Sequence, residues 1–353
     1  MTLQETAEAA QTSRPTREVR VWHVGRRGEV AGGMTQVVNA FLDWPFDRVE
    51  VKLLPTRNGG MGPVAIALML AAAIRMPFLG ARRKTVVAVH LSQGGSFLRE
   101  GLLLRWAAKL GFGTAAHLHG STFVDFAQRS PGLVARTLRA ADVIVALSDA
   151  TIAETSVLVP DSRVVLMQNA VPDGSPQAKE PLVVFAGAVT RRKGVDVLLE
   201  GWRRRAEADG WTLHVAGPAV EHELLEALPD GAIALGSTAH SELMALLDRS
   251  AVAVLPSRDE AMPMFILEAL ARRNAVISTT VGGIPGVLGD DAGLLVAPGS
   301  AEEFTVALDA LLGDPELRTR VADAGYARYE AEFAARTVYP RVEQLWLDTL
   351  ESG

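Results

Sequence analysis

The chain has 353 residues, 48% of them hydrophobic and 22% charged, with no cysteine and a formal net charge of −6. This length and composition exclude a disordered or fibrous chain and suit two domains of about 150 to 180 residues each, with a cleft between them. The missing cysteines exclude disulfides, thiolate nucleophiles and cysteine-ligated zinc.

The chain begins with a polar segment. Its first fifteen residues include Gln4, Glu5 and Gln11 and contain no apolar core. They therefore do not resemble a secretory signal. We expect a flexible tail over residues 1–17 and a cytoplasmic protein.

Five β-rich runs then alternate with segments of helical periodicity. Because the runs are apolar on both faces, they indicate strands of a parallel sheet that helices cover on both sides. The predicted domain is Rossmann-like and spans residues 18–172. Its predicted strands are residues 19–24, 86–91, 114–118, 143–147 and 164–167.

The longest apolar stretch of this half is residues 61–74, which ends before Arg75 and Pro77. It is too short to cross a bilayer. A basic cluster of Arg82, Arg83 and Lys84 follows it. The stretch is either a buried core helix or an interfacial helix with a basic edge. The second alternative predicts peripheral contact with an anionic membrane at its inner face.

Charge is distributed unevenly along the chain. Residues 1–172 hold 19 Lys or Arg against 13 Asp or Glu, and the remaining residues hold 16 against 28. The first part can therefore face an anionic surface, unless its arginines are merely scattered over a solvated surface. No aromatic-basic pattern accompanies them, so nucleic acid is not an expected partner.

A run of turn-forming residues over 172–181 interrupts the alternation and predicts a linker over 173–181. A second α/β series follows and predicts another Rossmann-like domain over 182–325. Its predicted strands are residues 182–185, 212–215, 251–255, 276–278 and 294–296. The last part of the chain is purely helical, and residues 326–353 are expected to bridge back to the first domain.

The segment 255–270, LPSRDEAMPMFILEAL, carries the strongest chemical signal. A buried strand ends there in a polar loop, and a helix is predicted to begin near Pro263. Glu260 and Glu268 flank that helix start, where the amides of Met264 and Phe265 would attract phosphate. Carboxylates also accept hydrogen bonds from sugar hydroxyls. The alternative is that Glu260 favours a helix start and Glu268 is an ordinary surface residue.

The two glutamates before LEALA resemble the signature of retaining glycosyltransferases of family four, which have the GT-B fold. Several other segments resemble motifs of the same family: FAGAVTRRKG at 185–194, TTVGGIPG at 279–286, GDDAGLLVAPG at 289–299, GEVAGGM at 28–34 and HLHG at 117–120. The resemblance covers about residues 19 to 330. It implies two Rossmann-like domains that face each other across a cleft.

The resemblance also implies roles for individual residues. Glu268 would hold the ribose hydroxyls of a nucleotide-sugar donor, and Glu260 the hydroxyls of the transferred sugar. Lys193 would neutralise the diphosphate, the leaving group whose charge must be stabilised. His119 would contact the donor sugar near its anomeric centre. The alternatives for Lys193 and His119 are an ordinary exposed cation and a satisfied histidine at a strand end.

Glycines after the first strand form a separate candidate. Gly32 and Gly33 would let backbone amides approach the diphosphate or the acceptor. Their spacing with Gly28 does not fit the dinucleotide fingerprint, which disfavours a nicotinamide dehydrogenase. His117, two residues before His119, is expected to point to the opposite face of the sheet.

Two positions depart from the family's pattern. Ala188 stands where the family usually has an arginine beside the diphosphate, so Arg191 or Arg192 substitutes for it or the donor site is weakened; Arg192 is the marginal preference. Gly286 stands where glutamate is frequent. No D-x-D carboxylate pair is found, so we expect neither a metal nor a cofactor.

The sequence thus predicts a metal-independent enzyme that transfers a hexosyl group, with retention, from a nucleotide diphosphate sugar to a glycan or lipid-linked acceptor. Polysaccharide or glycolipid biosynthesis is the expected setting. Two alternatives stay open. One is a catalytically weak GT-B subunit that supports a partner transferase, which Ala188 favours. The other is an epimerase or phosphorylase of the same architecture, although the cofactor lysine of phosphorylases is absent.

Overall fold

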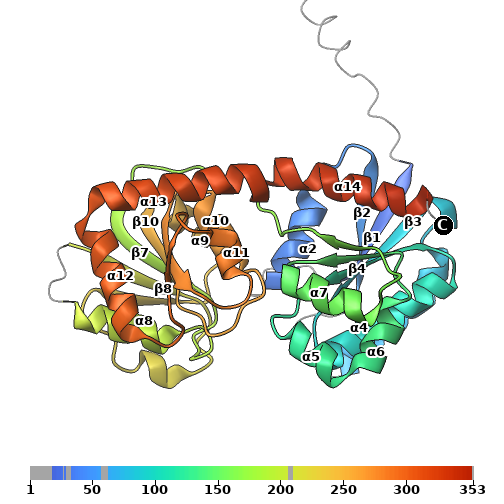
Figure 1. Ribbon diagram of the computed structural model, residues 1–353, viewed down its shortest axis with the longest axis horizontal. Helices are drawn as coiled ribbons and strands as arrows, with labels where there is room; N and C mark the ends of the chain where they lie inside the picture. The colour runs from blue at the N-terminus through green and yellow to red at the C-terminus, as the bar shows by residue number, and fades with distance from the viewer. Residues whose placement is uncertain (1–17, 27, 29–32, 57–62, 206–209, 352–353) are drawn as a thin grey trace, which may run out of the picture.

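The structure is a computed structural model that describes residues 18–26, 28, 33–56, 63–205 and 210–351. Two α/β domains lie side by side and are spanned along one edge by a long helical segment (Figure 1). The tail expected over residues 1–17 lies outside the described residues.

The amino-terminal domain contains a six-stranded parallel sheet in the order β2-β1-β3-β4-β5-β6. Its strands are β1 (Val19–Gly25), β2 (Val49–Pro55), β3 (Thr85–Leu91), β4 (Gly113–Leu118), β5 (Val143–Ala146) and β6 (Val164–Leu166). Its helices are α2 (Gly33–Asp43), α3 (Pro63–Arg75), α4 (Gly94–Lys109), α5 (Phe123–Arg129), α6 (Pro131–Leu138) and α7 (Asp149–Leu158).

The carboxyl-terminal domain repeats this architecture with a parallel sheet in the order β12-β11-β10-β7-β8-β9. Its strands are β7 (Glu180–Ala186), β8 (Thr212–Ala216), β9 (Ala232–Gly236), β10 (Ser250–Leu255), β11 (Ala275–Thr279) and β12 (Leu294–Val296). Its helices are α8 (Val195–Arg204), α9 (His240–Arg249), α10 (Met264–Leu270), α11 (Ile284–Leu288), α12 (Ala301–Gly313) and α13 (Pro315–Arg328).

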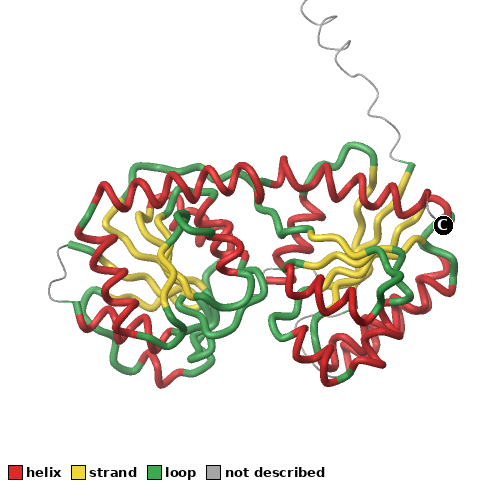
Figure 2. Tube along the Cα trace, in the orientation of Figure 1, coloured by secondary structure: helices red, strands yellow, loops and turns green. Residues whose placement is uncertain are grey.

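Each sheet lies between layers of helices, as Figure 2 shows. The central strands explain this arrangement, because every residue of β3 and of β10 is buried. Strands with two apolar faces need helices on both sides. The predicted α/β class, with two parallel sheets, is therefore confirmed.

The end of the chain returns to the first domain. After α13, a π-helical turn (Tyr329–Phe333) leads into α14 (Ala335–Glu351). Trp346 of α14 is fully buried and meets His23 of β1 edge-on, with 5.3 Å between the ring centroids. The hydroxyl of Tyr329 donates to Asp173, which ties the turn to the segment before β7. The last helix thus packs into the core of the amino-terminal domain.

Candidate functional site

Lys193 and Glu260 form an ion pair at the carboxyl ends of two neighbouring strands. Lys193 lies in the loop between β7 and α8, and Glu260 lies in the loop between β10 and α10. Because β7 and β10 are adjacent in the sheet, these loops leave it at the same edge. Ser257 donates a second hydrogen bond to Glu260 Oε1, at 2.8 Å. The carboxylate is buried and fixed from two sides.

Two glycines let the loops around this pair approach closely. Gly194 has φ 74°, and a Cβ there would lie 1.8 Å from the carbonyl oxygen of Pro256. Gly282 has φ 54°, and its Cβ would lie 1.7 Å from the carbonyl oxygen of Glu260. Only glycine fits either position, because a side chain would clash with backbone and strain the left-handed conformation. Three segments that resemble family motifs therefore meet at one point.

Glu268 is buried within α10, the helix that follows the loop of Glu260. Burial raises the pKa of its carboxyl, and the nearby His240 and Arg272 oppose that shift. His240 Nε2, at the start of α9, lies 3.7 Å from Glu268 Oε1. The carboxylate of Glu268 is thus shielded from water and has the imidazole of His240 as a neighbour. The alternative that Glu268 is a surface residue is wrong.

The helix expected to begin near Pro263 does so, with Pro263 as the residue before α10. The first amides of a helix have no acceptor inside it. Met264 and Phe265 occupy those positions and are nearly buried. Their proposed contact with phosphate stays a prediction.

Arg191 and Arg192, which follow Ala188, contact different parts of the domain. The guanidinium of Arg192 donates to the backbone carbonyl of Asp259 at 3.0 Å, so it lies beside the loop that carries Glu260. Arg191 lies 3.8 Å from Asp196, and the two arginine side chains are similarly exposed, at 63% for Arg191 and 53% for Arg192. Of the two candidates, Arg192 is the one held at the site.

The two domains touch at the same edge. Ser121, which follows β4, donates to Asp259 Oδ2 at 2.9 Å. Asn169, at the end of the amino-terminal domain, donates to the carbonyl oxygen of Met262 at 3.3 Å. The carboxyl ends of the first sheet thus face the loop of Asp259 to Met262 in the second domain.

His119 lies on this edge and ends a chain of hydrogen-bonded histidines. His119 Nε2 lies 2.8 Å from His90 Nδ1, and His90 Nε2 lies 2.7 Å from His23 Nδ1. Burial lowers the pKa of His119 to about 4. Burial, and to a lesser extent His119, lowers the pKa of His23 to about 3. Neutral imidazoles therefore connect the interdomain edge with the core below α14.

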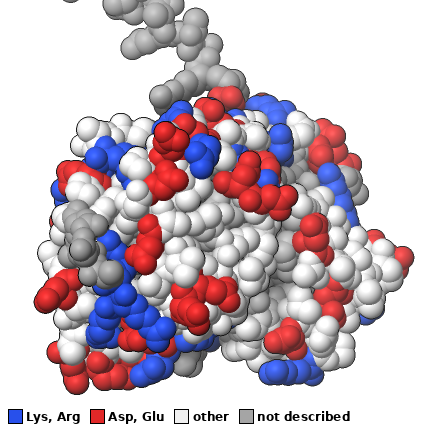
Figure 3. All heavy atoms as spheres, turned by 60° about the vertical axis from the view of Figure 1, so that its left-hand side comes forward, with Lys and Arg blue, Asp and Glu red and all other residues white. Residues whose placement is uncertain are grey.

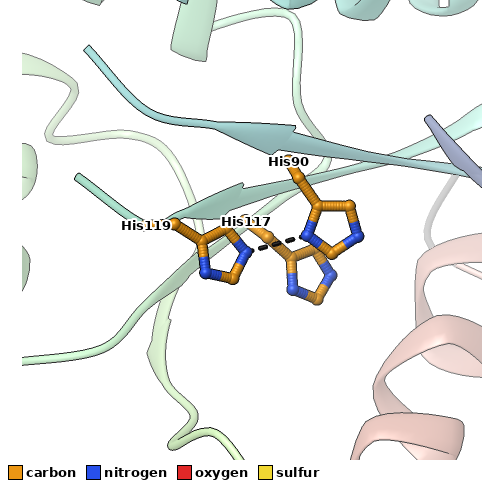
Figure 4. Close-up of side chains that lie close together, drawn as sticks. All are labelled: His90, His117 and His119. Atoms are coloured by element: carbon orange, nitrogen blue, oxygen red, sulfur yellow. Dashed lines mark hydrogen bonds between the residues drawn. The ribbon is translucent and has the colours of Figure 1, made fainter. Parts of the chain in front are cut away.

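The expectation that His117 points away from His119 is wrong. Their rings are nearly parallel, with centroids 6.2 Å apart, and both lie next to His90 (Figure 4). The reason is the two-residue period of a strand, which puts side chains i and i+2 on one face. Burial, with smaller contributions from His23 and His119, lowers the pKa of His117 well below its ordinary value.

His90, His117 and His119 are also the group of side chains whose spacing suits a metal ion, with ligand atoms within 4.8 Å of one another. Both ring nitrogens of His90 already take part in hydrogen bonds to other histidines. A metal would have to displace one of these bonds, because a ligating nitrogen needs its lone pair. A metal-independent reaction stays a prediction.

Gly32 and Gly33 are the glycines expected to approach the diphosphate or the acceptor. Gly33 is the first residue of α2 and is exposed, and a Cβ there would meet nothing within 4 Å. Gly32 lies outside the described residues. Their role toward a diphosphate or an acceptor stays a prediction.

Two cavities lie at opposite ends of the strands of the amino-terminal sheet. One of about 470 Å³ lies at the amino ends of β5 and β6, away from every candidate residue, and is lined in part by Arg139, Asp142 and Arg163. A smaller one lies at the opposite strand ends and is lined by His117, His119 and Asn169, among others. In doubly wound sheets ligands bind beyond the carboxyl ends of the strands, so the second location is the relevant one.

Comparison with solved structures identifies the architecture as GT-B. The fold superposes on sucrose-phosphate synthase from Thermosynechococcus elongatus with a TM-score of 0.74 and 16% identity, over 95% of this chain and 100% of the other. It superposes on Anabaena HepE in complex with UDP and glucose with a TM-score of 0.70 and 14% identity, over 93% of this chain and 99% of the other. The predicted GT-B fold is confirmed.

Residues 168–328 match the sequence profile of the family described as glycosyl transferases group 1. The match covers slightly less than half of the chain and lies mainly in the carboxyl-terminal domain. Glycogen synthase of Mycobacterium tuberculosis (strain H37Rv) is 29% identical over 177 residues, which are 47% of this chain and 42% of the relative. The chain therefore spans less than half the length of that relative. The family resemblance expected from the motifs is confirmed.

Within this group 1 glycosyl transferase segment, sequence reasoning missed the residues that hold the candidate side chains. Ser257 bonds Glu260, Asp259 joins Ser121 across the domains, and His240 approaches Glu268. Ser257 and Asp259 stand in the strand-end loop already singled out, which was a usable signal. His240 follows a strand that the sequence pattern did not reveal.

Proposed function

We propose that this protein is a retaining glycosyltransferase that moves a hexosyl group from a nucleotide diphosphate sugar to a glycan or lipid-linked acceptor. The observation that carries the proposal is the ion pair of Lys193 with Glu260, which lies in the loop that leads into α10, the helix in which the carboxylate of Glu268 is buried. A cation and two carboxylates at one edge supply what a diphosphate and two sets of sugar hydroxyls need. The match of residues 168–328 to the group 1 glycosyl transferases supports the same reaction class.

In the proposed mechanism, Lys193 stabilises the charge that develops on the leaving diphosphate, aided by Arg192 and the first amides of α10. Glu260 orients the transferred sugar and Glu268 the ribose. His119, held by His90, contacts the sugar near its anomeric centre. No carboxylate stands out as a nucleophile, so the acceptor attacks on the face from which the phosphate departs. The leaving phosphate oxygen takes the acceptor's proton, and neither a metal nor a cofactor takes part.

The donor is proposed to carry UDP, GDP or a related nucleotide, and UDP is the nucleotide bound to the structural relative HepE. The proposed setting is polysaccharide or glycolipid biosynthesis in the cytoplasm, at the inner face of a membrane. Among the described residues, no helix is long and apolar enough to span a bilayer.

A thermal-shift screen of nucleotides and nucleotide sugars tests the proposal, because a ligand that binds only the native state raises the melting temperature by mass action. The expected result is a concentration-dependent rise for one nucleotide class. Product analysis by NMR should then show transfer with retained anomeric configuration. Nucleotide binding without turnover would favour a supporting subunit, and no stabilisation by any nucleotide would overturn the proposal.

A further inference from the structure

Two neighbouring helices of the amino-terminal domain expose a row of large apolar side chains. In α3 and the turn after it the most exposed are Ile74, at 71%, and Phe78, at 84%. The α3–α4 surface is defined by Val64, Ile66, Leu70, Ile74, Phe78, Leu98, Leu102 and Trp106. An ordinary surface helix has a polar outer face, so a continuous apolar one calls for an explanation.

The apolar side chains form one surface because the helices are packed together. Trp106 Nε1 of α4 donates to the carbonyl oxygen of Ala73 in α3, at 3.2 Å. Leu98, Leu102 and Trp106 are four residues apart and so form one stripe along α4. Both helices also bury their other face in the same core, through Ala72 and Leu104. The exposed stripe is therefore a second apolar face and not a misplaced core face.

The charges around this surface have one sign. Residues 51–124 contain nine Lys or Arg and a single acidic residue, Glu100, which is 1% exposed. Arg75, Arg83, Arg105 and Lys109 are exposed and form no ion pair with any residue of the described ranges. By contrast, the side of the carboxyl-terminal domain that faces the viewer in Figure 3 mixes acidic and basic side chains.

Two further basic residues are engaged within the protein. Lys84 forms an exposed ion pair with Glu18, at 2.7 Å. Arg82 donates to the carbonyl oxygen of Leu110 and stacks over Phe112. These contacts leave the basic residues around the α3–α4 surface in excess, since Glu18 is the one acidic residue among the described partners of these two side chains. The surface thus combines exposed apolar groups with an excess of positive charge.

We propose that the α3–α4 surface docks this protein onto an anionic lipid bilayer. Large apolar side chains enter the boundary between headgroups and acyl chains, and basic side chains attract anionic headgroups, as in other interfacial helices. Trp106 suits this boundary because an indole has an apolar body and a polar edge. The surface is peripheral, since neither helix is long enough to span.

A second copy of the chain fits the α3–α4 surface less well than an anionic bilayer does. A two-fold dimer through this surface would bring the same patch of both copies together. Arg75 and Arg105 of one copy would then lie close to the same basic side chains of the other copy. Like charges at an interface oppose association. An anionic bilayer satisfies both the apolar and the basic component.

The position of the surface also bears on the acceptor, and this step rests on the proposed function. Helix α4 begins after Gln93, which lies against Gly120 next to His119 at the interdomain edge. Leu98 of the apolar stripe is in the second turn of that helix. A bilayer that contacts Leu98 therefore lies near the interdomain edge that carries His119. Of the two acceptor classes, the lipid-linked one is therefore the one inferred.

Vesicle flotation with the full chain, in the absence of any donor, tests the docking. The wild type should bind vesicles of phosphatidylglycerol and phosphatidylcholine, bind phosphatidylcholine alone at least about tenfold less, and lose binding as salt rises from about 0.05 M to about 0.5 M. The double variant Ile74→Glu, Phe78→Glu should lower the partition coefficient at least about tenfold. Val306→Glu, an exposed apolar residue on α12, is the matched control and should bind as the wild type does.

Both substituted side chains are exposed, so a retained melting temperature and unchanged nucleotide binding will show that the double variant folds. This separates the docking from the proposed function, because nucleotide binding is measured without lipid. Equal binding to neutral vesicles, or equal binding by the double variant, would overturn the proposal. A wild type that does not bind vesicles, but is a dimer that the double variant dissociates, would assign the surface to self-association instead.

Discussion

Lys193 and Glu260 are 67 residues apart in the chain, yet they form an ion pair where β7 and β10 end side by side. Ser257 donates to the same carboxylate oxygen, and the lysine loop packs onto Pro256 at Gly194. The pair is thus built into the strand ends before any ligand arrives. It presents one cation and one carboxylate to the edge where the domains meet.

Lys193→Ala should lower the transfer rate at saturating donor by about 10²-fold, because it removes a preorganised charge from the leaving diphosphate. Glu260→Gln should also impair transfer, and the two losses should not add, since the residues interact directly. Transfer rates of the two single variants and the double variant give the coupling. Arg320→Ala, an exposed cation on α13, should leave the rate unchanged. Additive losses would show that the pair does not act as a unit.

Glu268→Gln should weaken nucleotide binding, because the ribose hydroxyls lose a charged acceptor worth about 1.5 to 3 kcal/mol, or about 10- to 150-fold in Kd. Glutamine keeps the volume of the buried side chain, so packing is preserved. Isothermal titration with the preferred nucleoside diphosphate measures the change. Glu302→Gln, on the exposed start of α12, is the control. An unchanged Kd for Glu268→Gln would refute the ribose assignment.

The sequence pattern located the central strands of both sheets but missed β2 (Val49–Pro55) and β9 (Ala232–Gly236). Both missed strands lie at a sheet edge. Edge strands pack on one neighbour only, and neither β2 nor β9 is uniformly buried. In β2, VEVKLLP, charged residues also interrupt the continuous apolar run by which β3 and β10 are recognised. Partial burial alone does not explain both misses, because the partly buried edge strands β6 and β12 are predicted.

For the candidate site, the sequence reveals the main side chains but not the residues that contact them. Glu260, Glu268 and Lys193 could be found from sequence because each lies in a strand-end motif. The partners of these residues could not, because Ser121 and Asp259 or His240 and Glu268 meet only through the packing of separate elements. The prediction that His117 points away from His119 is wrong, although the two-residue period of a strand alone places both side chains on one face.

Acid should destabilise the fold between pH 6.5 and about 4. His23, His117 and His119 have lowered pKa values in the native state, so the unfolded chain binds more protons in this range. Stability then falls with falling pH by about 1.4 kcal/mol per pH unit for each such histidine. Urea unfolding at several pH values measures the slope. His117→Leu should reduce this slope by the contribution of about one proton, because it removes one buried neutral imidazole. A slope that His117→Leu leaves unaltered would contradict burial as the cause.

Transfer activity should survive a strong chelator, because the proposed charge stabilisation uses Lys193 and backbone amides in place of an ion. Activity before and after treatment with EDTA, followed by gel filtration, is the measurement. Loss that added magnesium restores would reveal a metal at the diphosphate. Loss that only zinc restores would point instead to His90, His117 and His119 as ligands.

The last prediction concerns the cation that Ala188 does not supply. Arg192 is held against the backbone of Asp259, within the loop that carries Glu260, whereas Arg191 extends toward Asp196. An arginine can bind a phosphate bidentately, so the one next to the ion pair is the better substitute.

Arg192→Ala should therefore reduce turnover by an amount comparable to Lys193→Ala, since both cations oppose charge on the same leaving group. Arg191→Ala is the matched control, because it removes a neighbouring arginine of equal charge that points elsewhere. Transfer rates of the three variants at saturating donor decide the matter. A near-wild-type rate for Arg192→Ala with an impaired Lys193→Ala would discard the compensation, and near-wild-type rates for all three would remove the loop from the diphosphate site altogether.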